Sequence, residues 1–312
     1  MEKEGTRTMT QEPFSVVTGA FSYTGGFIAR RLLASGHRVR TLTGHPDPAQ
    51  PYGDRLTARP YNFDNPQQLT ESLRGASTLY NTYWVRFNRG AITFPQAVAH
   101  SRVLIQAARD AGVTRLVHIS VTNASPESPL PYFRGKGQVE QAIRESGISH
   151  AILRPAFIFG PGDILLNNVA WLLRRFPLFA VPGRGDYRMQ PIFGDDLARL
   201  AVEAAASTEN FTVDALGPEV FTFDQWVGLI AHAVGRRARL VHLPPGLALT
   251  LAQLVGLLVR DAVLTRHEVA GLTSNLLFTG GPANGTTRFS QWLAENAGEI
   301  GVNYASEFRR HF

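Results

Sequence analysis

Residues 14–26 read Phe-Ser-Val-Val-Thr-Gly-Ala-Phe-Ser-Tyr-Thr-Gly-Gly and are the most informative part of the chain. The first five form a short apolar run, which is typical of a buried strand. The glycines follow where a tight turn leads into a helix predicted over residues 26–34, and Gly36 ends that helix. Because the first N–H groups of such a helix have no partner within it, this unit can bind the phosphates of a dinucleotide.

Apolar runs and amphipathic segments alternate from this unit onward. Strands are predicted over 39–43, 58–63, 78–85, 115–121 and 149–159, and helices over 65–73, 94–111 and 132–146. Strands that alternate with helices form a parallel sheet with helices on both faces. The predicted fold class is therefore α/β, a Rossmann-type doubly wound parallel sheet.

The alternation weakens after Gly160 and divides the chain. Residues 1–13 are predicted to form a flexible tail and residues 14–160 an NAD(P)-binding Rossmann core. Residues 161–312, with helices over 164–176, 196–206, 223–234 and 245–259, are predicted to form a smaller, mostly helical substrate-binding cap. Within it, residues from about 186 to 206 are expected to return to the core.

The composition excludes several classes of protein. The formal charge is +6, but the cations are spread along the chain, so no nucleic-acid-binding stripe is expected. The absence of cysteine excludes disulfides and thiolate metal sites, and the nine histidines lack metal-ligand spacing, so no metal is expected. No segment reaches the ~18 apolar residues of an integral membrane span, and residues 1–13 lack the apolar core of a secretory signal. A cytoplasmic protein is expected.

The turn after the first strand supplies most of the predicted cofactor contacts. Gly19 can form the bend, Gly25 or Gly26 can start the helix, and Ser22 stands where the usual pattern has its middle glycine. The predicted cofactor-binding residues here are Gly19, Phe21, Ser22, Tyr23, Thr24 and Gly25.

The ends of the second and third strands bear on the adenosine half of the cofactor. An acidic residue at the end of the second strand would bind the ribose of NAD, but the chain has Thr43 there. The cofactor is therefore predicted as NAD(P), with NADP(H) slightly favoured. Asn62 and Phe63 are predicted to meet the edge and face of the adenine, although a buried phenylalanine is equally ordinary.

Tyr132 and Lys136 form a candidate catalytic pair. Residues four apart share one face of a helix, and a cation near a phenol lowers the pKa of the tyrosine, which equips it for proton transfer. Lys136 is the only lysine after Lys3 in a chain with 29 arginines, so its compact ammonium is expected to have a specific role, including a contact with the cofactor ribose. Thr122, with Ser120 as the second choice, is predicted to supply a third hydroxyl at the sheet edge.

These segments together resemble the short-chain dehydrogenase/reductase superfamily, in its extended and atypical branches, which include NAD-dependent epimerase/dehydratase-like and NmrA-like proteins. Residues 18–25 resemble its cofactor turn, Tyr132 and Lys136 its catalytic pair, and Thr122 its Ser/Thr. Leu153-Arg-Pro155 and residues 159–163 are similar to its link to the substrate region. Residues 243–245, 260–261, 264–265 and 301–304 resemble the branch related to the 39-kDa subunit of respiratory complex I.

The resemblance implies three candidate functions. The first is an NAD(P)-dependent oxidoreductase that transfers hydride to or from a small apolar carbonyl or alcohol, with Tyr132 as acid/base. The second is a non-catalytic dinucleotide-binding redox sensor or assembly subunit. The third is a sugar-nucleotide epimerase or dehydratase, with Asn167, Asn168 and Arg188 near the nucleotide. Charges on the helices usually buried in dimers of this superfamily predict a monomer or weak homodimer.

Overall fold

A seven-stranded parallel sheet organises the first half of the protein. The computed structural model describes residues 14–47 and 49–308. The strand order is β11-β6-β5-β4-β1-β2-β3. The strands are β1 (Phe14–Thr18), β2 (Val39–Leu42), β3 (Leu56–Arg59), β4 (Ala76–Asn81), β5 (Arg115–Ile119), β6 (Ser149–Pro155) and β11 (Phe211–Ala215). Because the order reverses between β1 and β4, a crevice for a ligand is expected at their carboxyl ends.

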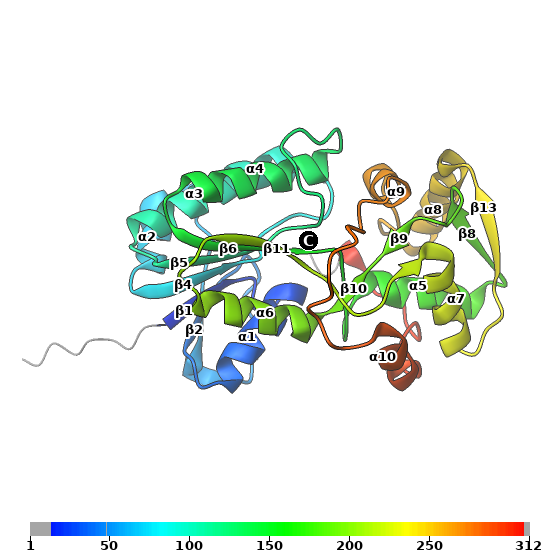
Figure 1. The fold of residues 1–312 in the computed structure, drawn as a ribbon, viewed down its shortest axis with the longest axis horizontal. Helices are drawn as coiled ribbons and strands as arrows, with labels where there is room; N and C mark the ends of the chain where they lie inside the picture. The colour runs from blue at the N-terminus through cyan, green and yellow to red at the C-terminus, as the bar shows by residue number, and fades with distance from the viewer. Residues whose placement is uncertain (1–13, 48, 309–312) are drawn as a thin grey trace, which may run out of the picture.

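Helices cover both faces of this sheet (Figure 1). One face carries α2 (Pro66–Leu73), α3 (Phe94–Asp110) and α4 (Pro131–Glu145), and the other carries α1 (Tyr23–Ala34) and α6 (Gly194–Ala206). Buried aliphatic side chains fill both interfaces, with Leu104 and Leu116 on the first and Ile28 and Leu197 on the second. The predicted Rossmann-type fold is confirmed.

The sequence predicts the ends of α3 to within one residue, whereas α1 begins at Tyr23, three residues before its predicted start. The Thr93 side chain accepts a hydrogen bond from the Gln96 N–H at the start of α3, and Gly112 follows the helix at φ +78°. Capping at one end and a left-handed glycine just beyond the other are local signals, so neighbouring residues are sufficient to predict them.

The predicted strand over 149–159 is two strands instead of one. β6 ends at Pro155, and β7 (Phe157–Phe159) pairs with β10 (Pro191–Phe193) in a separate two-stranded sheet. The uninterrupted apolar run conceals this break, because residues of both strands are buried in different cores. The chain thus leaves the main sheet at the edge where β5 and β6 end.

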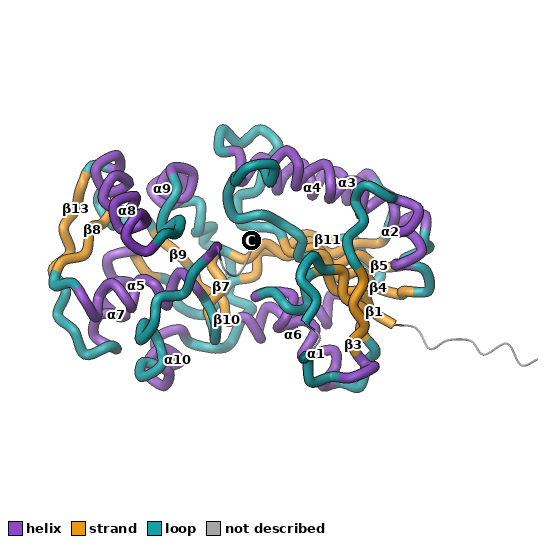
Figure 2. The backbone as a smooth tube through the Cα atoms, turned by 180° about the vertical axis from the view of Figure 1, so that it is seen from behind, coloured by secondary structure: helices purple, strands orange, loops and turns teal. Residues whose placement is uncertain are grey.

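The cap lies beyond the carboxyl ends of the sheet (Figures 1 and 2). Its core surrounds Trp226 and Phe289, which are fully buried. β11 lies after residue 206 and also returns to the main sheet, so the chain passes between the two halves several times. The cap elements are α5 (Ile164–Arg175), β8 (Leu178–Pro182), β9 (Arg188–Met189), β12 (Phe221–Thr222), α7 (Phe223–Ala233), β13 (Arg239–Leu243), α8 (Pro245–Val259), α9 (Arg266–Thr273) and α10 (Phe289–Asn296).

Candidate active site

The turn between β1 and α1 has the geometry that a dinucleotide phosphate needs. Gly19 has φ +66°, and a Cβ on Gly25 would lie 2.2 Å from the Gly19 carbonyl oxygen. Glycine is therefore required at Gly25 for the helix to approach the strand this closely. Ser22 is exposed at the N-terminus of α1, its hydroxyl donates back to the Gly19 carbonyl at 2.6 Å, and no side chain caps the helix. The backbone N–H groups of this first turn fit a pyrophosphate.

The neighbouring side chains divide between core and cavity. Phe21 and Tyr23 are half-buried and pack against the apolar core beneath the sheet. Tyr23 also lines a cavity of 320 Å³ at the carboxyl edge of the sheet, which we call the chamber. Thr24 is half-buried in the same turn. The turn therefore leads directly to the chamber.

Of the two residues predicted to meet the adenine, Asn62 is suited to a base edge and Phe63 is packed against other aromatic side chains. Asn62 has φ +45°, and its buried Nδ2 donates no hydrogen bond among the described residues. Phe63 stacks on Tyr61 at 4.9 Å and on His100 at 4.1 Å, so its ring belongs to an aromatic cluster. The Phe63 ring is thus packed against other side chains of the protein, which is the alternative to adenine contact that the sequence left open.

Thr43 directly follows β2, and the four residues of that strand include no carboxylate. Its hydroxyl donates to the His45 carbonyl at 3.1 Å and accepts from the His45 N–H at 3.0 Å. Its own N–H donates to the carbonyl of Arg59, the last residue of β3. An exposed arginine thus ends the strand next to Thr43, which the sequence could not show because the two positions meet only through strand pairing.

Lys136 is buried behind the end of β5. Its ammonium donates to the Ile119 carbonyl at 2.9 Å and lies 4.9 Å from the Trp84 ring. Burial lowers the pKa of Lys136 to about 7, and the Glu140 carboxylate opposes this shift. Glycine at position 135 leaves room for Trp84, since a Cβ there would lie 2.7 Å from the indole.

Tyr132 stands on the same helix and faces the chamber. Its ring makes an edge contact with Trp84 at 6.0 Å between centroids. Burial raises the pKa of the Tyr132 phenol to about 12, the charge of Glu268 adds to this, and Arg86 opposes it. The expected lowering of this pKa by Lys136 is wrong for this state of the protein, because burial dominates and Lys136 does not contribute to the shift. The phenol is held in its protonated form.

The predicted third hydroxyl is engaged elsewhere. Thr122 is fully buried, and its hydroxyl donates to the Leu276 carbonyl at 2.8 Å. The Ser120 hydroxyl donates to the buried Glu140 carboxylate at 2.6 Å, although Ser120 also lines the chamber. With the Thr122 and Ser120 hydroxyls engaged, Tyr132 is the remaining residue of the three that lines the chamber.

The chamber adjoins a second, larger cavity in the cap. This apolar cavity has a volume of 640 Å³ and is lined largely by aliphatic and aromatic side chains of α5, β8, β13, α8 and α9. Tyr132, Arg86 and Glu268 line both cavities, together with Val121, Ala156, Phe157 and Leu165. A molecule that spans the junction would place one end beside Tyr132 and the other among apolar side chains.

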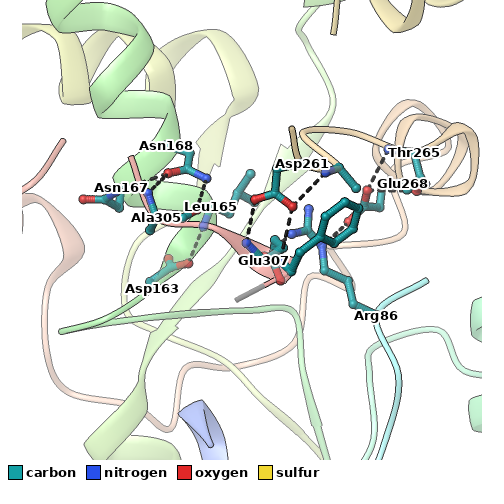
Figure 3. A network of polar contacts seen from close by, with 12 residues as sticks. Arg86, Asp163, Leu165, Asn167, Asn168, Asp261, Thr265, Glu268, Ala305 and Glu307 are labelled. Atoms are coloured by element: carbon teal, nitrogen blue, oxygen red, sulfur yellow. Dashed lines mark hydrogen bonds and ion pairs between the residues drawn. The ribbon is translucent and has the colours of Figure 1, made fainter. Parts of the chain in front are cut away.

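Arg86 joins the core to the cap at this junction (Figure 3). Its Nε lies 2.6 Å from a Glu268 carboxylate oxygen, and its guanidinium also pairs with Glu307. Burial lowers the pKa of Arg86, but these two carboxylates outweigh burial and raise it. The sequence pattern missed Arg86 and Glu268, since 182 positions separate them.

Asp163 is a further site residue without an assigned role in the sequence pattern. One carboxylate oxygen accepts the Leu165 N–H at 3.0 Å as the N-cap of α5, and the other is buried without a hydrogen bond among the described residues. Burial raises the pKa of Asp163 to about 7. Its place in the chamber wall could have been suspected from the Gly160-Pro-Gly-Asp163 turn.

The two asparagines expected near a sugar nucleotide bind the chain itself. The Asn167 side chain accepts from the Gly301 N–H and donates to the Asn303 carbonyl, and the Asn168 side chain pairs with both backbone groups of Ala305. These contacts are drawn in part in Figure 3. The expectation for Asn167 and Asn168 is corrected, because their amides hold the C-terminal segment in place.

Comparison with known proteins agrees with this architecture. Residues 19–162 match a family model described as NAD(P)H-binding. The chain is 24% identical over 259 residues to the mitochondrial NADH dehydrogenase [ubiquinone] 1 alpha subcomplex subunit 9 of Arabidopsis thaliana, covering 80% of this chain and 64% of that protein. It is 28% identical over 244 residues to ceramide reductase of Caulobacter vibrioides, covering 77% of this chain and 76% of that protein.

A solved structure supports the fold across nearly the whole chain. The NADPH-dependent quinone oxidoreductase of Escherichia coli, in complex with NADPH, superposes with a TM-score of 0.74 at 21% identity, covering 91% of this chain and 99% of that one. The resemblance to dinucleotide-binding proteins and to the complex I 39-kDa-like branch, predicted from the sequence, is confirmed.

Proposed function

We propose that the protein is an NAD(P)H-dependent reductase that transfers hydride to a carbonyl or quinone carbon of an apolar substrate, with Tyr132 as the proton donor. The observation that carries this proposal is the junction of the two cavities at Tyr132. A volume of 640 Å³ favours a larger substrate than the small molecule expected from the sequence. The names of the Caulobacter and Escherichia coli proteins, a ceramide reductase and a quinone oxidoreductase, agree with a reductase, and the first agrees with a lipid substrate.

The cofactor site is assigned from the residues that fit it. The first turn of α1 would hold the pyrophosphate, Asn62 the adenine edge, and the chamber the nicotinamide, which supplies the hydride when bound. Lys136 is assigned to the ribose hydroxyls, because its ammonium is fixed at the end of the strand that leads to the chamber. For the adenosine ribose, the missing carboxylate at Thr43 and the arginine at Arg59 favour NADP(H).

The proton chemistry follows from the environment of Tyr132. When hydride adds to a carbonyl carbon, the oxygen gains negative charge and takes a proton. A phenol whose pKa is raised to about 12 keeps its proton at neutral pH and can donate it to that more basic oxygen. The products are an alcohol, or a hydroquinone where the substrate is a quinone, together with the oxidised dinucleotide and a tyrosinate, which must regain a proton before the next cycle. This environment suits reduction better than oxidation, which would begin with the phenolate.

Two substitutions test the assignment. Tyr132→Phe removes only the hydroxyl, so kcat for reduction should fall by about 10² or more while dinucleotide affinity is retained. Lys136→Arg replaces a compact amine, whose pKa is lowered to about 7, by a planar guanidinium with a different donor geometry, so affinity should fall. NADPH fluorescence titration and NADPH oxidation with long-chain ketones and quinones measure the two effects. Tyr187→Phe is the matched control, because the Tyr187 hydroxyl in the cap core has no hydrogen bond among the described residues.

A binding protein without turnover is the second candidate. It is favoured by Thr122 and Ser120, whose hydroxyls are engaged by Leu276 and Glu140 and so cannot assist Tyr132. This candidate predicts dinucleotide binding, no turnover with any of these substrates, and no effect of Tyr132→Phe. A protein that binds neither NADH nor NADPH would contradict both candidates.

A further inference from the structure

Helix α8 is apolar on more than one side. Its fifteen residues, Pro-Gly-Leu-Ala-Leu-Thr-Leu-Ala-Gln-Leu-Val-Gly-Leu-Leu-Val, include no charged side chain. Ala248, Ala252 and Val255 line the apolar cavity. In contrast, Leu257 and Leu258 are each 76% exposed, so they contribute nothing to the packing of the cavity wall. A monomeric protein seldom exposes several large apolar side chains together without a partner for them.

The exposed apolar surface continues from α8 to the rim of the cavity. Leu251 and Leu254 of α8, Leu178 of β8 and the adjacent Phe176 are all exposed and also line the cavity. We call these four residues with Leu257 and Leu258 the apolar rim. α8, β8 and β13 lie together at the end of the molecule opposite the dinucleotide core (Figures 1 and 2). The partner that covers this end would therefore also meet the cavity mouth.

The charged residues of the segment from residue 229 to residue 266, which contains β13 and α8, are almost all positive. Outside this segment, Asp224 pairs with His242 of β13. The chain carries five arginines over residues 229–266, and the exposed ones include Arg239, Arg260 and Arg266. Arg239 pairs in register with Leu178, and Arg260 directly follows α8. The only acidic residue in this range is Asp261, which is buried and accepts the Glu307 N–H at 2.7 Å. No exposed carboxylate of this segment balances its arginines.

We propose that the apolar rim docks on the surface of a bilayer that contains anionic lipids. The leucines would enter the acyl boundary, and the flanking arginines would meet lipid phosphates. Within the described residues no helix is long and apolar enough to cross a membrane. Docking would lay α8 in the plane of the interface. A second copy of the chain fits less well, because two such rims would bring their arginines together without opposing carboxylates.

Docking would place the cavity mouth against the lipid. An apolar substrate could then pass between the bilayer and Tyr132 without crossing water. This step rests on the proposed function, whereas docking itself depends only on the rim and its charges.

Vesicle co-sedimentation of the full chain tests docking without any substrate. We expect binding to vesicles of phosphatidylcholine containing about one third phosphatidylglycerol, weaker binding to phosphatidylcholine alone, and loss of binding as salt is raised. The double substitution Leu257→Asp with Leu258→Asp should weaken binding at least about tenfold. The double substitution Arg239→Gln with Arg266→Gln should weaken binding to the anionic vesicles alone.

The matched control is Ile92→Asp with Val220→Asp, which places the same charges at exposed apolar positions away from α8. It should bind vesicles like the wild type. Unchanged melting temperatures would show that the variants fold, as expected from the high exposure of Leu257 and Leu258.

Three results would overturn docking. They are no binding by the wild type, equal binding by the Leu257/Leu258 variant, or a dimer in sedimentation velocity that this variant abolishes while vesicles are not bound. Failure of the reductase proposal has a different signature, since it would remove NADPH oxidation with detergent-dispersed substrates and leave vesicle binding intact.

Discussion

The dinucleotide core and the cap differ in how many of their large apolar side chains are exposed. Among the described residues, ten large apolar side chains are exposed, and Ile92 is the one that lies before residue 160. The other nine belong to the cap, and five of them are leucines of α8. The core closes its apolar surface under helices on both faces, whereas the cap leaves apolar surface both inside a cavity and outside.

This difference indicates how each half recognises a ligand. The core offers backbone N–H groups at a glycine turn, which fit a phosphate through geometry, and Gly25 has no room there for a side chain. The cap offers volume and apolar surface, which select by size and hydrophobicity. Substitutions in the core should therefore act sharply on the dinucleotide, and substitutions in the cap should act gradually on the substrate.

The largest effect is expected for Gly25→Val. A Cβ at this position would lie 2.2 Å from the Gly19 carbonyl oxygen, so the turn must open and the helix N-terminus must move. NADPH affinity should fall at least about 100-fold, measured by fluorescence titration. Gly26→Ala is the milder change in the same turn, because its Cβ would lie 3.3 Å from the Ala20 carbonyl oxygen, a tight contact that needs only a small shift. Equal affinity of the Gly25 variant and wild type would contradict the assigned phosphate site.

The second largest effect is expected for Asp163, at the boundary between the core and the cap, on the free energy of unfolding. Because burial raises the pKa of Asp163 from 3.8 to about 7, the folded state holds a proton that the unfolded chain releases between these pH values. The stabilisation that this carboxyl group gives the folded state is therefore fully present below pH 3.8 and is lost as the pH rises to about 7. The free energy of unfolding falls by up to about 4 kcal/mol over this range.

Asp163→Asn should remove this dependence while keeping an oxygen to cap α5. Urea unfolding at about pH 5 and about pH 8 should show the wild type losing stability relative to this variant as pH rises. Asp186→Asn, which alters an exposed carboxylate paired with Arg184, should follow the wild type. A parallel pH response of the Asp163 variant and wild type would disprove the prediction.

A moderate effect is expected inside the cap. Ala252→Trp would fill part of the apolar cavity, so KM for a long-chain substrate should rise about tenfold while NADPH affinity stays unchanged. Gln253→Trp adds the same side chain at the adjacent exposed position of α8, which does not line the cavity, and should leave KM unchanged in detergent. Identical KM values for both variants would place the substrate elsewhere.

The smallest effect is expected for Arg59→Glu. The Arg59 carbonyl accepts a hydrogen bond from the Thr43 N–H, so the backbone of Arg59 lies next to the end of β2. The exposed Arg59 side chain projects from this position. If it meets the 2′-phosphate, the ratio of NADPH to NADH affinity should fall about fivefold, as for an exposed ion pair. Arg109→Glu makes the same charge change on the outside of α3 and should not alter this ratio.

The prediction of the fold from sequence succeeded where signals are local. The apolar run of β1, the glycine turn and the alternation through β5 depend on neighbouring residues, and the structure retains them. The break after β6 was missed, since β7 finds its partner in β10, more than thirty positions away along the chain. The same limit explains why Tyr132 and Lys136 could be placed on one helix face, but not their pKa values.

The residue order alone specified the Rossmann-type core, the phosphate turn and the pair on α4, because backbone preferences and helical spacing are properties of adjacent residues. It could not specify which side chains remain available to a ligand. Thr122 is engaged by Leu276, 154 positions away, and Arg86 by carboxylates that follow it by 182 and 221 positions. Availability, burial and the junction of the two cavities depend on contacts between distant segments, and these exist only once the cap has folded against the core.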